Sequence, residues 1–513
     1  MTEGNGDIRK LPKGWTWTRL GNLGKIVAGG TPSTKNEEYW GNEVFWVSPA
    51  DLSGYKRKFI SRGRKSLSKL GLENSSAKLM SAGSILFSSR APIGYVVISA
   101  NEICTNQGFK SLVPSKEIFN EYIYYYLKAS KQLAEKYASG TTFKELSGKS
   151  FSILPIPLPP HKEQKRIVER IEELFSDIDQ GVESLKTAQK QLKVYRQAVL
   201  KWAFEGKLTE AWRKQRDPST IKTGEALLTQ IKAERENRDR QQLAEWEEAV
   251  EMWEAIGKVG KKPTKPQKLQ EPSPLTTTEL AVLPALPLEW CYVRAEAICD
   301  FITKGTTPSK EQLFSGSGDV PFIKVYNLTD SGSLDFTVNP TFVSTETHNG
   351  FLNRSKVLPS DVLMNIVDPP LGKVSLVPNT FNEWNINQAI VRYRALNVLL
   401  SKYLMYYLLS QVTIDRMSKR AKATAGQFNL TLEICRNTEV PICSPEEQEE
   451  IIQEIESRLS ICDQLEATIT ENLQKAEALR QSILKQAFEG KLVPQDPNDE
   501  PAEKLLEQIR LEQ

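Results

Sequence analysis

Two long stretches of the chain repeat apolar residues every seven positions. Between Glu163 and Trp202 one apolar position recurs in each heptad, and a second is interrupted only at Gly181. The stretch after Ser444-Pro445-Glu446-Glu447 has the same pattern, and this tetrapeptide is a typical helix start with a serine cap, an early proline and acids in the first turn. Two apolar positions per heptad predict a coiled-coil seam. Its expected residues are Ile171, Ile178, Leu185, Leu192 and Val199 in the first helix and Ile455, Cys462, Ile469, Leu473 and Ile483 in the second.

A different pattern precedes each long helix. Short runs of β-branched and aromatic residues, bounded by Gly, Pro, Ser and Asn, predict strands at 84–88, 95–98 and 151–156. The tyrosine-rich segments 122–127 and 403–408 have helical spacing and predict one packed helix in each globular part. Stacking of an unpaired base on these tyrosines is conceivable, but packing in the core is favoured. The fold class is therefore α/β, as mixed α+β globular domains with a long α-helical coiled-coil spacer.

The chain repeats itself at an offset of about 280 residues. The hexapeptide Ala-Phe-Glu-Gly-Lys-Leu occurs at 203–208 and again at 487–492. Leu-Pro-x-x-Trp begins at Leu11 and at Leu286, and Asn106-Gln107 is echoed by Asn387-Gln388. Solenoid periods reach only roughly 50 residues, so this spacing indicates a duplicated domain and a pseudo-two-fold organisation. Two similar domains joined by helices suggest a target with two parts.

Composition is typical of a globular protein, with 39% hydrophobic and 26% charged residues in 513. No apolar run approaches the roughly 20 residues that cross a bilayer, and the N-terminal segment lacks the apolar core of a signal peptide. We therefore expect a cytoplasmic protein without a membrane contact. The six cysteines form no Cys-x-x-Cys pair and are interpreted as packing residues.

The sequence contains no convincing set of catalytic residues. The two histidines, His161 and His348, lie in different repeats without a cysteine or carboxylate cluster, so neither a metal site nor a nucleophile is expected. Asp368-Pro369-Pro370-Leu371 is similar to the catalytic loop of amino-methyltransferases, but Leu371 is not aromatic and no glycine-rich cofactor turn precedes it. Residues 29–33 lack the lysine of a phosphate-binding loop and are interpreted as a turn. We expect no enzymatic activity from this chain.

Charge is nearly balanced overall, with 67 basic and 64 acidic residues and a net charge of +3. The stretch from Lys56 to Lys78 nevertheless has a single acid, Glu73, among eight basic residues. Such a stretch could follow a phosphate backbone, and a solvated surface is the alternative. A second basic cluster, 416–422, precedes a small-residue turn that aligns with 139–143 of the first repeat. Both turns are candidate sites of close approach to DNA.

The aligned repeats suggest how two half-sites could differ. Arg90 aligns with Asp368 before a shared Pro-apolar-Gly turn. Arginine binds guanine N7 and O6 together, whereas aspartate accepts from a cytosine or adenine amino group. A surface salt bridge at each position is the alternative. Asn106-Gln107 and its echo are interpreted as a loop support rather than as adenine contacts.

The order of these motifs resembles the DNA-specificity subunit of Type I restriction-modification enzymes. The resemblance rests on residues 156–164 before the first long helix with 203–208 after it, and on 440–448 with 487–492 in the second repeat. It implies two target recognition domains that bind a bipartite, gapped double-stranded DNA site, and an antiparallel helical spacer that docks two methyltransferase subunits. It also implies adenine N6 methylation and, with a restriction motor subunit, cleavage in phage defence. S-adenosylmethionine would belong to the methyltransferase partner, ATP and Mg to the motor, and no cofactor to this chain.

The sequence patterns and the resemblance together divide the chain into six parts. They also give a set of candidate DNA contacts. The parts are target recognition domain 1 at 1–157, a central helix at 158–210, a helical extension and polar linker at 211–284, target recognition domain 2 at 285–442, a distal helix at 443–492 and a C-terminal helical tail at 493–513. The candidate DNA-binding residues are Thr31, Ser33, Lys56, Arg57, Lys58, Arg62, Arg64, Lys65, Ser88, Ser89, Arg90, Thr141, Thr142, Thr307, Ser309, Asn365, Asp368, Lys373, Lys419, Arg420, Lys422 and Gln427.

Two other functions stay open at this stage. The chain could be an orphan adaptor whose globular domains bind a protein or RNA, which an interaction insensitive to salt would support. It could also be a catalytic methyltransferase fragment, which methyl transfer by the isolated chain would support. The extension after residue 211 is expected to pack on the ends of the spacer or on the methyltransferase subunits.

Overall fold

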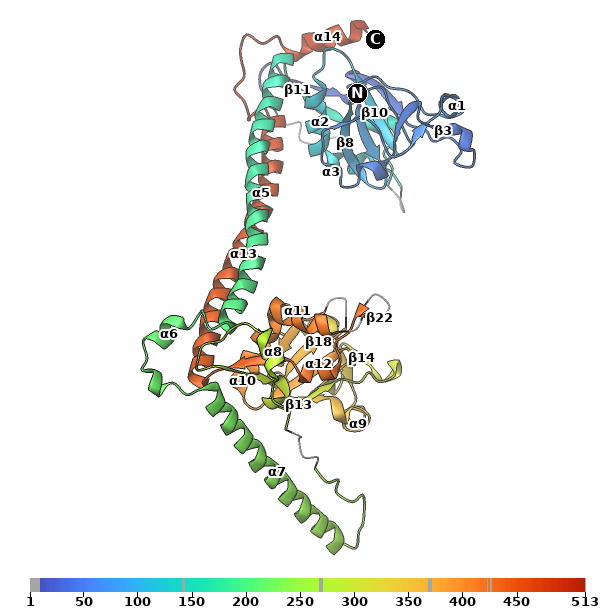
Figure 1. The fold of residues 1–513 in the computed structure, drawn as a ribbon. Coiled ribbons are helices and arrows are strands. Elements are labelled where there is room, and N and C mark those ends of the chain that lie inside the picture. The colour runs from blue at the N-terminus through green and yellow to red at the C-terminus, as the bar shows by residue number, and fades with distance from the viewer. Residues whose placement is uncertain are drawn as a thin grey trace. The chain divides into compact units, whose positions relative to one another are not determined.

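A computed structural model describes residues 10–140, 144–266, 271–367, 371–421, 423–424 and 427–512. The chain divides into two compact units, Met1–Thr187 with Ile469–Gln513, and Ala188–Thr468. Each unit contains one globular domain and a part of each long helix, α5 and α13 (Figure 1). Each unit therefore combines residues from both sequence repeats. The two helices are α5 (His161–Phe204) and α13 (Pro445–Phe488).

The first globular domain, domain 1, is built on three sheets. The five-stranded sheet has the order β2-β10-β7-β8-β5, the four-stranded sheet the order β3-β6-β4-β9, and β1 pairs with β11. The strands are β1 (Thr16–Arg19), β2 (Gly24–Ala28), β3 (Trp40–Gly41), β4 (Val44–Val47), β5 (Phe59–Ile60), β6 (Ser66–Leu67), β7 (Ile85–Ser89), β8 (Ile93–Ser99), β9 (Cys104–Thr105), β10 (Phe109–Pro114) and β11 (Pro155–Leu158).

The second globular domain, domain 2, repeats this plan. β13-β21-β18-β19 corresponds to the first four strands of the large sheet, β14-β16-β15-β20-β17 forms the other sheet, and β12 pairs with β24 as β1 does with β11. The strands are β12 (Cys291–Arg294), β13 (Cys299–Lys304), β14 (Phe314–Ser315), β15 (Val320–Ile323), β16 (Thr341–Val343), β17 (Lys356–Val357), β18 (Val362–Asn365), β19 (Val374–Leu376), β20 (Trp384–Ile386), β21 (Ile390–Ala395), β22 (Ala423–Thr424), β23 (Gln427–Phe428) and β24 (Glu439–Ile442).

Short helices complete each unit. The remaining helices are α1 (Lys69–Glu73), α2 (Asn120–Ala129), α3 (Lys131–Tyr137) and α4 (Gly148–Ser152) in domain 1, α6 (Glu210–Lys214), α7 (Gly224–Ala255) and α8 (Thr277–Ala281) in the extension, α9 (Thr345–Asn349), α10 (Val398–Leu409), α11 (Gln411–Arg420) and α12 (Leu432–Arg436) in domain 2, and α14 (Ala502–Glu512) at the end.

The tyrosine-rich helices α2 and α10 pack in the cores, which confirms the favoured interpretation of their rings. Tyr122 is fully buried and its hydroxyl donates to the Pro157 carbonyl at 2.7 Å. Tyr403 does the same with the Pro441 carbonyl at 2.9 Å. Both rings are buried and both hydroxyls are hydrogen-bonded, so the rings have a structural role and are not available for base stacking.

The two long helices form where the heptads predict them and run antiparallel. In the first unit Arg480 of α13 pairs with Asp179 of α5, while Ile483 and Ala487 share a core with the earlier Ile171. The backbone N–H of Glu447 donates to the Ser444 hydroxyl at 3.1 Å, so the predicted cap is present. Of the expected seam residues, Ile171, Val199, Ile455, Cys462, Ile469 and Ile483 are buried, and Ile178, Leu185, Leu192 and Leu473 are half-buried.

The predicted strand at 151–156 is wrong in its first half. Phe151 and Ser152 end helix α4, and β11 begins only at Pro155. The reason lies before the segment, because the Ser147 hydroxyl accepts from the N–H of Ser150 at 3.0 Å and starts a short helix. A run of apolar residues alone does not show where such a helix ends.

The extension and the C-terminal tail pack on the globular domains in equivalent ways. The N–H of Ala502, in α14, donates to the Gly14 carbonyl at 2.9 Å. The N–H of Gly224, in α7, donates to the Glu289 carbonyl at 2.7 Å. Each helix therefore lies beside the Leu-Pro-x-x-Trp motif of its own unit. Beyond this contact α7 continues, and the indole N–H of Trp246 donates to the Pro263 carbonyl at 3.0 Å in the polar linker.

Two further features of the described residues bear on class. None of their helices is both long and apolar enough to span a bilayer. All six cysteines are free thiols, and five of them are buried. Burial raises the pKa of the Cys104 thiol to about 12, so it stays protonated and packs as a small apolar side chain.

Candidate nucleic-acid interface

In domain 1 the loop after β2 rests against the turn before β10. The Thr31 hydroxyl donates to the side-chain carbonyl of Gln107, and the N–H of Gly30 donates to the Thr105 carbonyl at 2.8 Å. The two backbones are so close that a Cβ atom at Gly29 would lie 1.9 Å from the Asn106 carbonyl oxygen. Glycine is required there because of this close approach.

We call this contact between the loop and the turn the loop frame, and domain 2 contains the same arrangement. The N–H of Gln388 donates to the Thr307 hydroxyl at 3.2 Å, and a Cβ atom at Gly305 would lie 2.1 Å from the Asn387 carbonyl oxygen. In both domains the asparagine side chain accepts from the backbone two residues later, at 2.8 Å for Asn106 and 3.2 Å for Asn387. The asparagines therefore support the turn, in agreement with their interpretation from the sequence. Ser33 and Ser309 are exposed beyond the frame.

Three predicted DNA contacts are wrong because the side chains are buried. The Ser88 hydroxyl donates to the Pro92 carbonyl at 2.7 Å, and the Ser89 hydroxyl donates to the Gly108 carbonyl at 3.0 Å. The side-chain amide of Asn365 donates to the Val367 carbonyl at 2.9 Å. All three residues have no exposed surface, because both faces of β7 and β18 are buried. Their polar groups satisfy turns rather than ligands.

Arg90 belongs to a small charge cluster on the loop frame of domain 1. Its guanidinium lies 3.5 Å from one carboxylate oxygen of Glu145, and the buried Lys110 ammonium lies 3.4 Å from the other. Lys110 also donates to the Gln107 carbonyl at 3.3 Å, which ties the cluster to the turn. The sequence predictions missed Lys110 and Glu145. A lysine within a strand that also contains Phe109, Leu112 and Val113 was the available signal.

The strand register corrects the predicted alignment of Arg90 with Asp368 by one residue. The N–H of Leu146 donates to the Ser89 carbonyl in domain 1, as Leu430 does to the Ile366 carbonyl in domain 2, both at 2.9 Å. The residue that follows Ser89 therefore corresponds to the residue that follows Ile366. By the same ladders Arg90, Lys110 and Glu145 of domain 1 correspond to Val367, Val391 and Asn429 of domain 2.

The predicted basic stretch of domain 1 is exposed in part. Lys56, Arg57 and Arg62 are exposed. Arg64 is exposed but pairs with Asp51 at 3.3 Å, and the Lys65 ammonium lies 5.1 Å from the centre of the Trp40 ring. Lys58 differs, because its ammonium bridges the carboxylates of Glu121 and Glu172. Lys58 as a DNA contact stays a prediction, although two carboxylates already pair with its charge.

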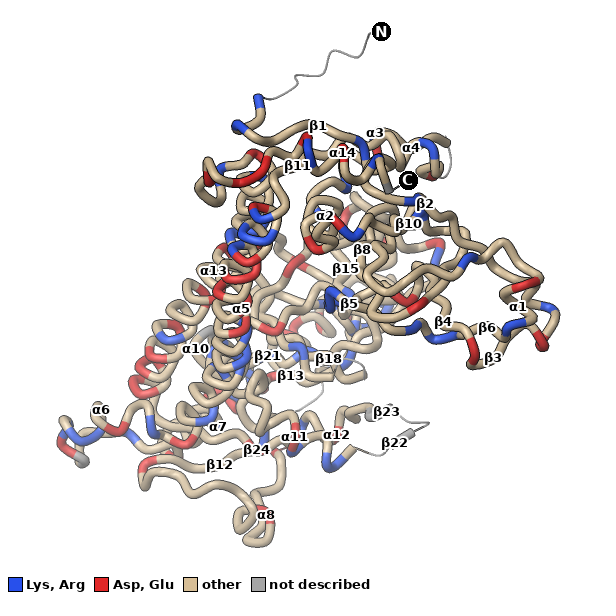
Figure 2. Tube along the Cα trace, turned by 90° about the horizontal axis from the view of Figure 1, so that it is seen from above, with Lys and Arg blue, Asp and Glu red and all other residues tan. Residues whose placement is uncertain are grey.

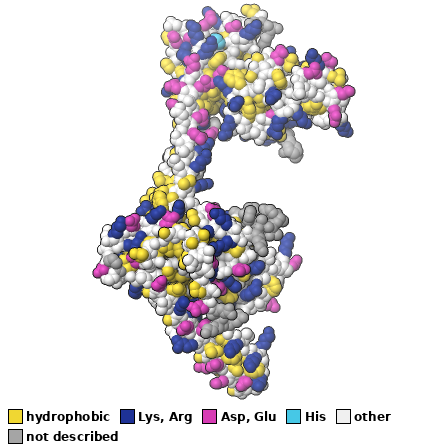
Figure 3. Space-filling view, in the orientation of Figure 1, with side chains coloured by type: hydrophobic (Ala, Val, Ile, Leu, Met, Phe, Trp, Pro, Cys, Tyr) yellow, Lys and Arg dark blue, Asp and Glu magenta, His cyan; other side chains and the backbone are white. Residues whose placement is uncertain are grey.

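The other candidates have mixed surroundings. Thr307 and Lys419 are exposed and Lys373 is half-buried, whereas Arg420 forms an ion pair with the buried Glu439. Thr141, Thr142, Asp368 and Lys422 lie outside the described residues, and of Gln427 only the backbone, in β23, is described. Along α5 the acidic residues of 172–183 precede the basic residues of 186–201, whereas both signs are interspersed on the face seen in the space-filling view (Figures 2 and 3).

His348 is a structural group of domain 2. Its ring is buried, with Nε2 3.0 Å from Glu383 and Nδ1 3.0 Å from the side-chain amide of Asn385. Burial lowers the pKa of His348, and the nearby Glu383 opposes this shift only in part. Across the described residues no group of three or more His, Cys, Asp or Glu side chains is arranged to hold a metal ion.

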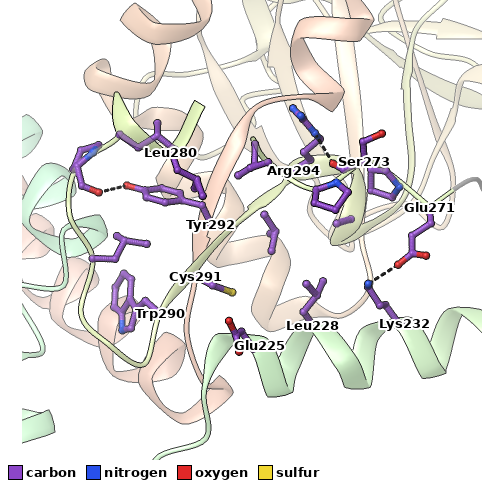
Figure 4. Close-up of a pocket in the computed structure, with 18 of the residues that line it drawn as sticks. Glu225, Leu228, Lys232, Glu271, Ser273, Leu280, Trp290, Cys291, Tyr292 and Arg294 are labelled. Carbon is purple, nitrogen blue, oxygen red and sulfur yellow. Dashed lines mark hydrogen bonds and ion pairs between the residues drawn. The ribbon is translucent and has the colours of Figure 1, made fainter. Parts of the chain in front are cut away.

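A cavity of about 1010 Å³ lies between α7, the segment 271–286 and β12 (Figure 4). Leucine and proline side chains form much of its wall. Lys232 pairs with Glu271 at 2.5 Å at one side, and Arg294 donates to the Ser273 carbonyl at 2.8 Å at another. These contacts hold the segment after the linker against domain 2, so the cavity belongs to the packing of the extension and not to the loop frame.

With this geometry in place, similarity to known proteins assigns the family. A family model described as the Type I restriction modification DNA specificity domain matches residues 12–187 and again residues 287–475. The chain belongs to this family. Its two matched stretches each begin at the Leu-Pro-x-x-Trp motif and extend into a long helix, in agreement with the predicted duplication.

Curated relatives carry names from the same class. The chain is 39% identical to the Type I restriction enzyme MjaIX specificity subunit of Methanocaldococcus jannaschii, over 31% of this chain and 38% of that subunit. It is 32% identical to the HindI specificity subunit of Haemophilus influenzae, again over 38% of that subunit. The EcoKI specificity subunit of Escherichia coli is 23% identical over 98% of this chain and 96% of that one. These relatives are named as specificity subunits.

Solved structures share the fold. A chain from a study of complex assembly and conformational transition of the type I R-M system superposes with a TM-score of 0.62 at 20% identity, covering 94% of this chain and 99% of that one. The HsdS subunit from Thermoanaerobacter tengcongensis covers the same shares with a TM-score of 0.50 at 19% identity. The mixed α/β fold with long helices is therefore that of known specificity subunits.

Proposed function

We propose that this chain is the DNA-specificity subunit of a Type I restriction-modification complex. Each globular domain reads one half of a bipartite, gapped double-stranded site, and the antiparallel helices act as the spacer between the two readers. The chain itself directs chemistry that its partners perform. Membership of the specificity-domain family and the named relatives support this assignment.

One observation carries the proposal that the halves differ. The same loop frame recurs in both domains, with Thr31 and Gln107 in the first and Thr307 and Gln388 in the second. On this frame, charged side chains in domain 1 stand where domain 2 has apolar or amide side chains, at the three equivalent positions given above. A common backbone with different side chains suits two readers of different sequence, because base edges are distinguished by their donors and acceptors.

Partners and cofactors follow from this assignment. Two methyltransferase subunits would bind the helical spacer and bring S-adenosylmethionine for adenine N6 methylation. A restriction motor, using ATP and Mg, would join them when the complex cleaves. We assign the recognition domains to 1–157 and 285–442, with the helices and extensions between and after them as predicted from the sequence.

Methylation mapping tests this function directly. The genome of a host that expresses this chain with its neighbouring methyltransferase is sequenced for N6-methyladenine, beside a strain in which the gene of this chain is deleted. A gapped two-part motif that disappears on deletion supports the proposal and supplies both half-sites. Expression of both proteins without any lost motif contradicts it, and the adaptor function then becomes the better account.

A further inference from the structure

In domain 1 the contact between helix α2 and the long helix α5 contains two acids and one lysine. Glu121 of α2 and Glu172 of α5 both bind the ammonium of Lys58, which comes from the loop before β5. The Tyr125 hydroxyl donates to Glu172 at 3.2 Å. Burial alone would lower the pKa of Lys58, but its two carboxylate partners reverse the sign and the pKa is raised. The lysine is therefore held in its charged form between two elements.

The equivalent contact in domain 2 has a different composition. The Tyr406 hydroxyl donates to Glu456 of α13 at 3.4 Å, as Tyr125 does to Glu172. Lys402 of α10 pairs directly with Glu456 at 3.1 Å. One helical residue therefore supplies the positive charge, and no loop residue takes part in this pair.

Backbone hydrogen bonds show which positions correspond. The N–H of Ile98 donates to the Lys58 carbonyl at 2.9 Å, and the N–H of Leu376 donates to the Gly332 carbonyl at 2.8 Å, on strands with the same neighbours. Lys58 therefore corresponds to Gly332. Tyr122 and Tyr403 bind equivalent carbonyls, so the residues that precede them, Glu121 and Lys402, also correspond.

The positive charge has thus exchanged places between the two domains. Domain 1 has a lysine on the loop and an acid on the helix, whereas domain 2 has a glycine on the loop and a lysine on the helix. Gly332 has a φ of +90°, and a Cβ atom there would lie 2.8 Å from the sulfur of Met405. The backbone conformation of Gly332 therefore disfavours a lysine at this position of the loop in domain 2, and Lys402 on the helix supplies the charge instead. Both arrangements neutralise the spacer acid.

We propose that Lys58 is a positioning residue that attaches the loop 55–60 of domain 1 to the spacer helix α5. The inference rests on the proposed function, because a fixed joint between reader and spacer sets the register of one half-site. The exposed Lys56 and Arg57 share this loop and line a groove of about 1150 Å³ against α5 and α13. The joint holds these two cations beside the spacer, and domain 2 has no such link between loop and helix through Gly332.

Removal of Lys58 leaves two carboxylates facing each other without a counter-ion. The two carboxylates repel each other, and the cost of this repulsion in free energy is larger where the groups are partly buried. The arrangement of domain 2 predicts the remedy, since a lysine at position 121 would pair with Glu172 directly. Rescue by this second change distinguishes a charge-neutralising joint from a contact of Lys58 with DNA.

The experiment compares the full chain with Lys58→Met, Glu121→Lys and the double variant, each expressed with the methyltransferase in the host. Methylated adenines are mapped at sites with the native gap and with gaps one base pair longer or shorter. Lys58→Met is expected to lower methylation at the native gap by about fivefold, a coupling typical of partly buried pairs, and to leave both half-site sequences unchanged. The double variant is expected to restore it. Lys56→Met, on the same loop, serves as the matched control in the DNA-free measurement.

A second measurement needs no DNA. Hydrogen exchange on the purified chain follows the amides of Ile98 and Ala100, which bind the carbonyls of Lys58 and Ile60. Lys58→Met is expected to accelerate them, and Lys56→Met is not. A changed base in one half-site, or a double variant that stays impaired, overturns the proposal. If the unmodified chain gives no motif at all, the proposed function fails, and unchanged exchange in Lys58→Met then overturns the joint independently.

Discussion

The ring of Phe204 lies edge-on against the ring of Tyr403, with 5.1 Å between their centroids. Phe204 ends helix α5, which follows domain 1 in the sequence, yet its partner is in the core of domain 2. Phe488 at the end of α13 makes the reciprocal contact with Tyr122 of domain 1, at 5.4 Å. The repeated hexapeptide that first revealed the duplication therefore closes the core of the other domain.

This crossed packing gives a crossed mutational effect. Phe204→Ala should destabilise domain 2 by about 3–5 kcal/mol, because a buried aromatic ring is lost and a cavity remains. Domain 1 should be unaffected, although it is the domain that precedes Phe204 in sequence. Hydrogen exchange, resolved by domain in the purified chain, measures both effects.

Phe488→Ala is the matched control for this prediction. It should weaken domain 1 and leave domain 2 at its original stability, since Phe488 packs on Tyr122 and Tyr126. If both variants weaken the same domain, or if each weakens the domain that precedes it, the crossed packing is wrong.

Arg90→Ala tests whether the charge cluster of domain 1 reads bases. The substitution leaves Glu145 paired with Lys110 alone, so the fold should persist. We expect the methylated motif to lose discrimination at one position of one half-site, by about 1–3 kcal/mol, with the other half-site intact.

The salt dependence of binding separates the two possible roles of Arg90. Uniformly weaker binding to all sequences, with a smaller slope of affinity against salt, would show that Arg90 contacts only a phosphate. Glu145→Gln is the companion variant, because it removes the charge that holds both cations while it keeps the size of the side chain.

The buried His348 predicts a pH dependence of domain 2. Its pKa lies below the ordinary 6.5, so on acidification the unfolded chain binds a proton that the folded chain resists. The stabilising contribution is full above pH 6.5 and is lost as the pH falls towards the lower folded pKa. Glu383 binds the ring and also pairs with Lys356 at 3.6 Å.

Thermal melts of the full chain at pH 7.5, 6 and 5 measure this effect. The melting temperature of domain 2 should fall on acidification. This fall should be smaller in His348→Gln. The unit of domain 1 contains His161, whose pKa is also lowered, so the comparison is made between the unmodified chain and His348→Gln. If the melting temperature of domain 2 depends equally on pH in the unmodified chain and in His348→Gln, other groups cause the acid sensitivity.

Gly181 offers a gain of stability in α5. A Cβ atom there would have no other atom within 4 Å, and alanine favours the helix over glycine by about 1 kcal/mol. Gly181→Ala should therefore raise the unfolding temperature of the first unit. Gly29→Ala is the contrasting variant, and it should lower that temperature because its Cβ atom would collide with the Asn106 carbonyl.

The long helices, the duplication and the mixed α/β class could be predicted because each depends on a pattern that extends over many residues. Each heptad pattern repeats over more than five helical turns, so a single exception does not obscure it. The ends of α5 and α13 therefore differ from the prediction by only a few residues. Short elements lack this redundancy. The serine cap that makes α4 and the many two-residue strands depend on local hydrogen bonds that no periodicity reveals.

The candidate site was harder to predict for a related reason. Ser88, Ser89 and Asn365 are polar residues of a kind that contacts DNA, but both faces of their strands are buried, which depends on how other elements pack on the sheet and not on residue type. Lys58 looked like one cation in a basic stretch, and only tertiary contacts bring Glu121 and Glu172 to it. The one-residue shift between Arg90 and Asp368 likewise appears only in the strand ladders.

Phe204 and Phe488 make reciprocal contacts, so each domain is completed by the helix that follows the other domain in the sequence. The first described residues and the last helix meet in one unit, where Ala502 binds Gly14, and the equivalent bond between Gly224 and Glu289 lies inside the chain. The linker between Gly224 and Glu289 is therefore a second place at which the chain could begin and end. New termini between residues 257 and 276, with the original ends joined by a short linker, should therefore yield a protein that folds in the same way.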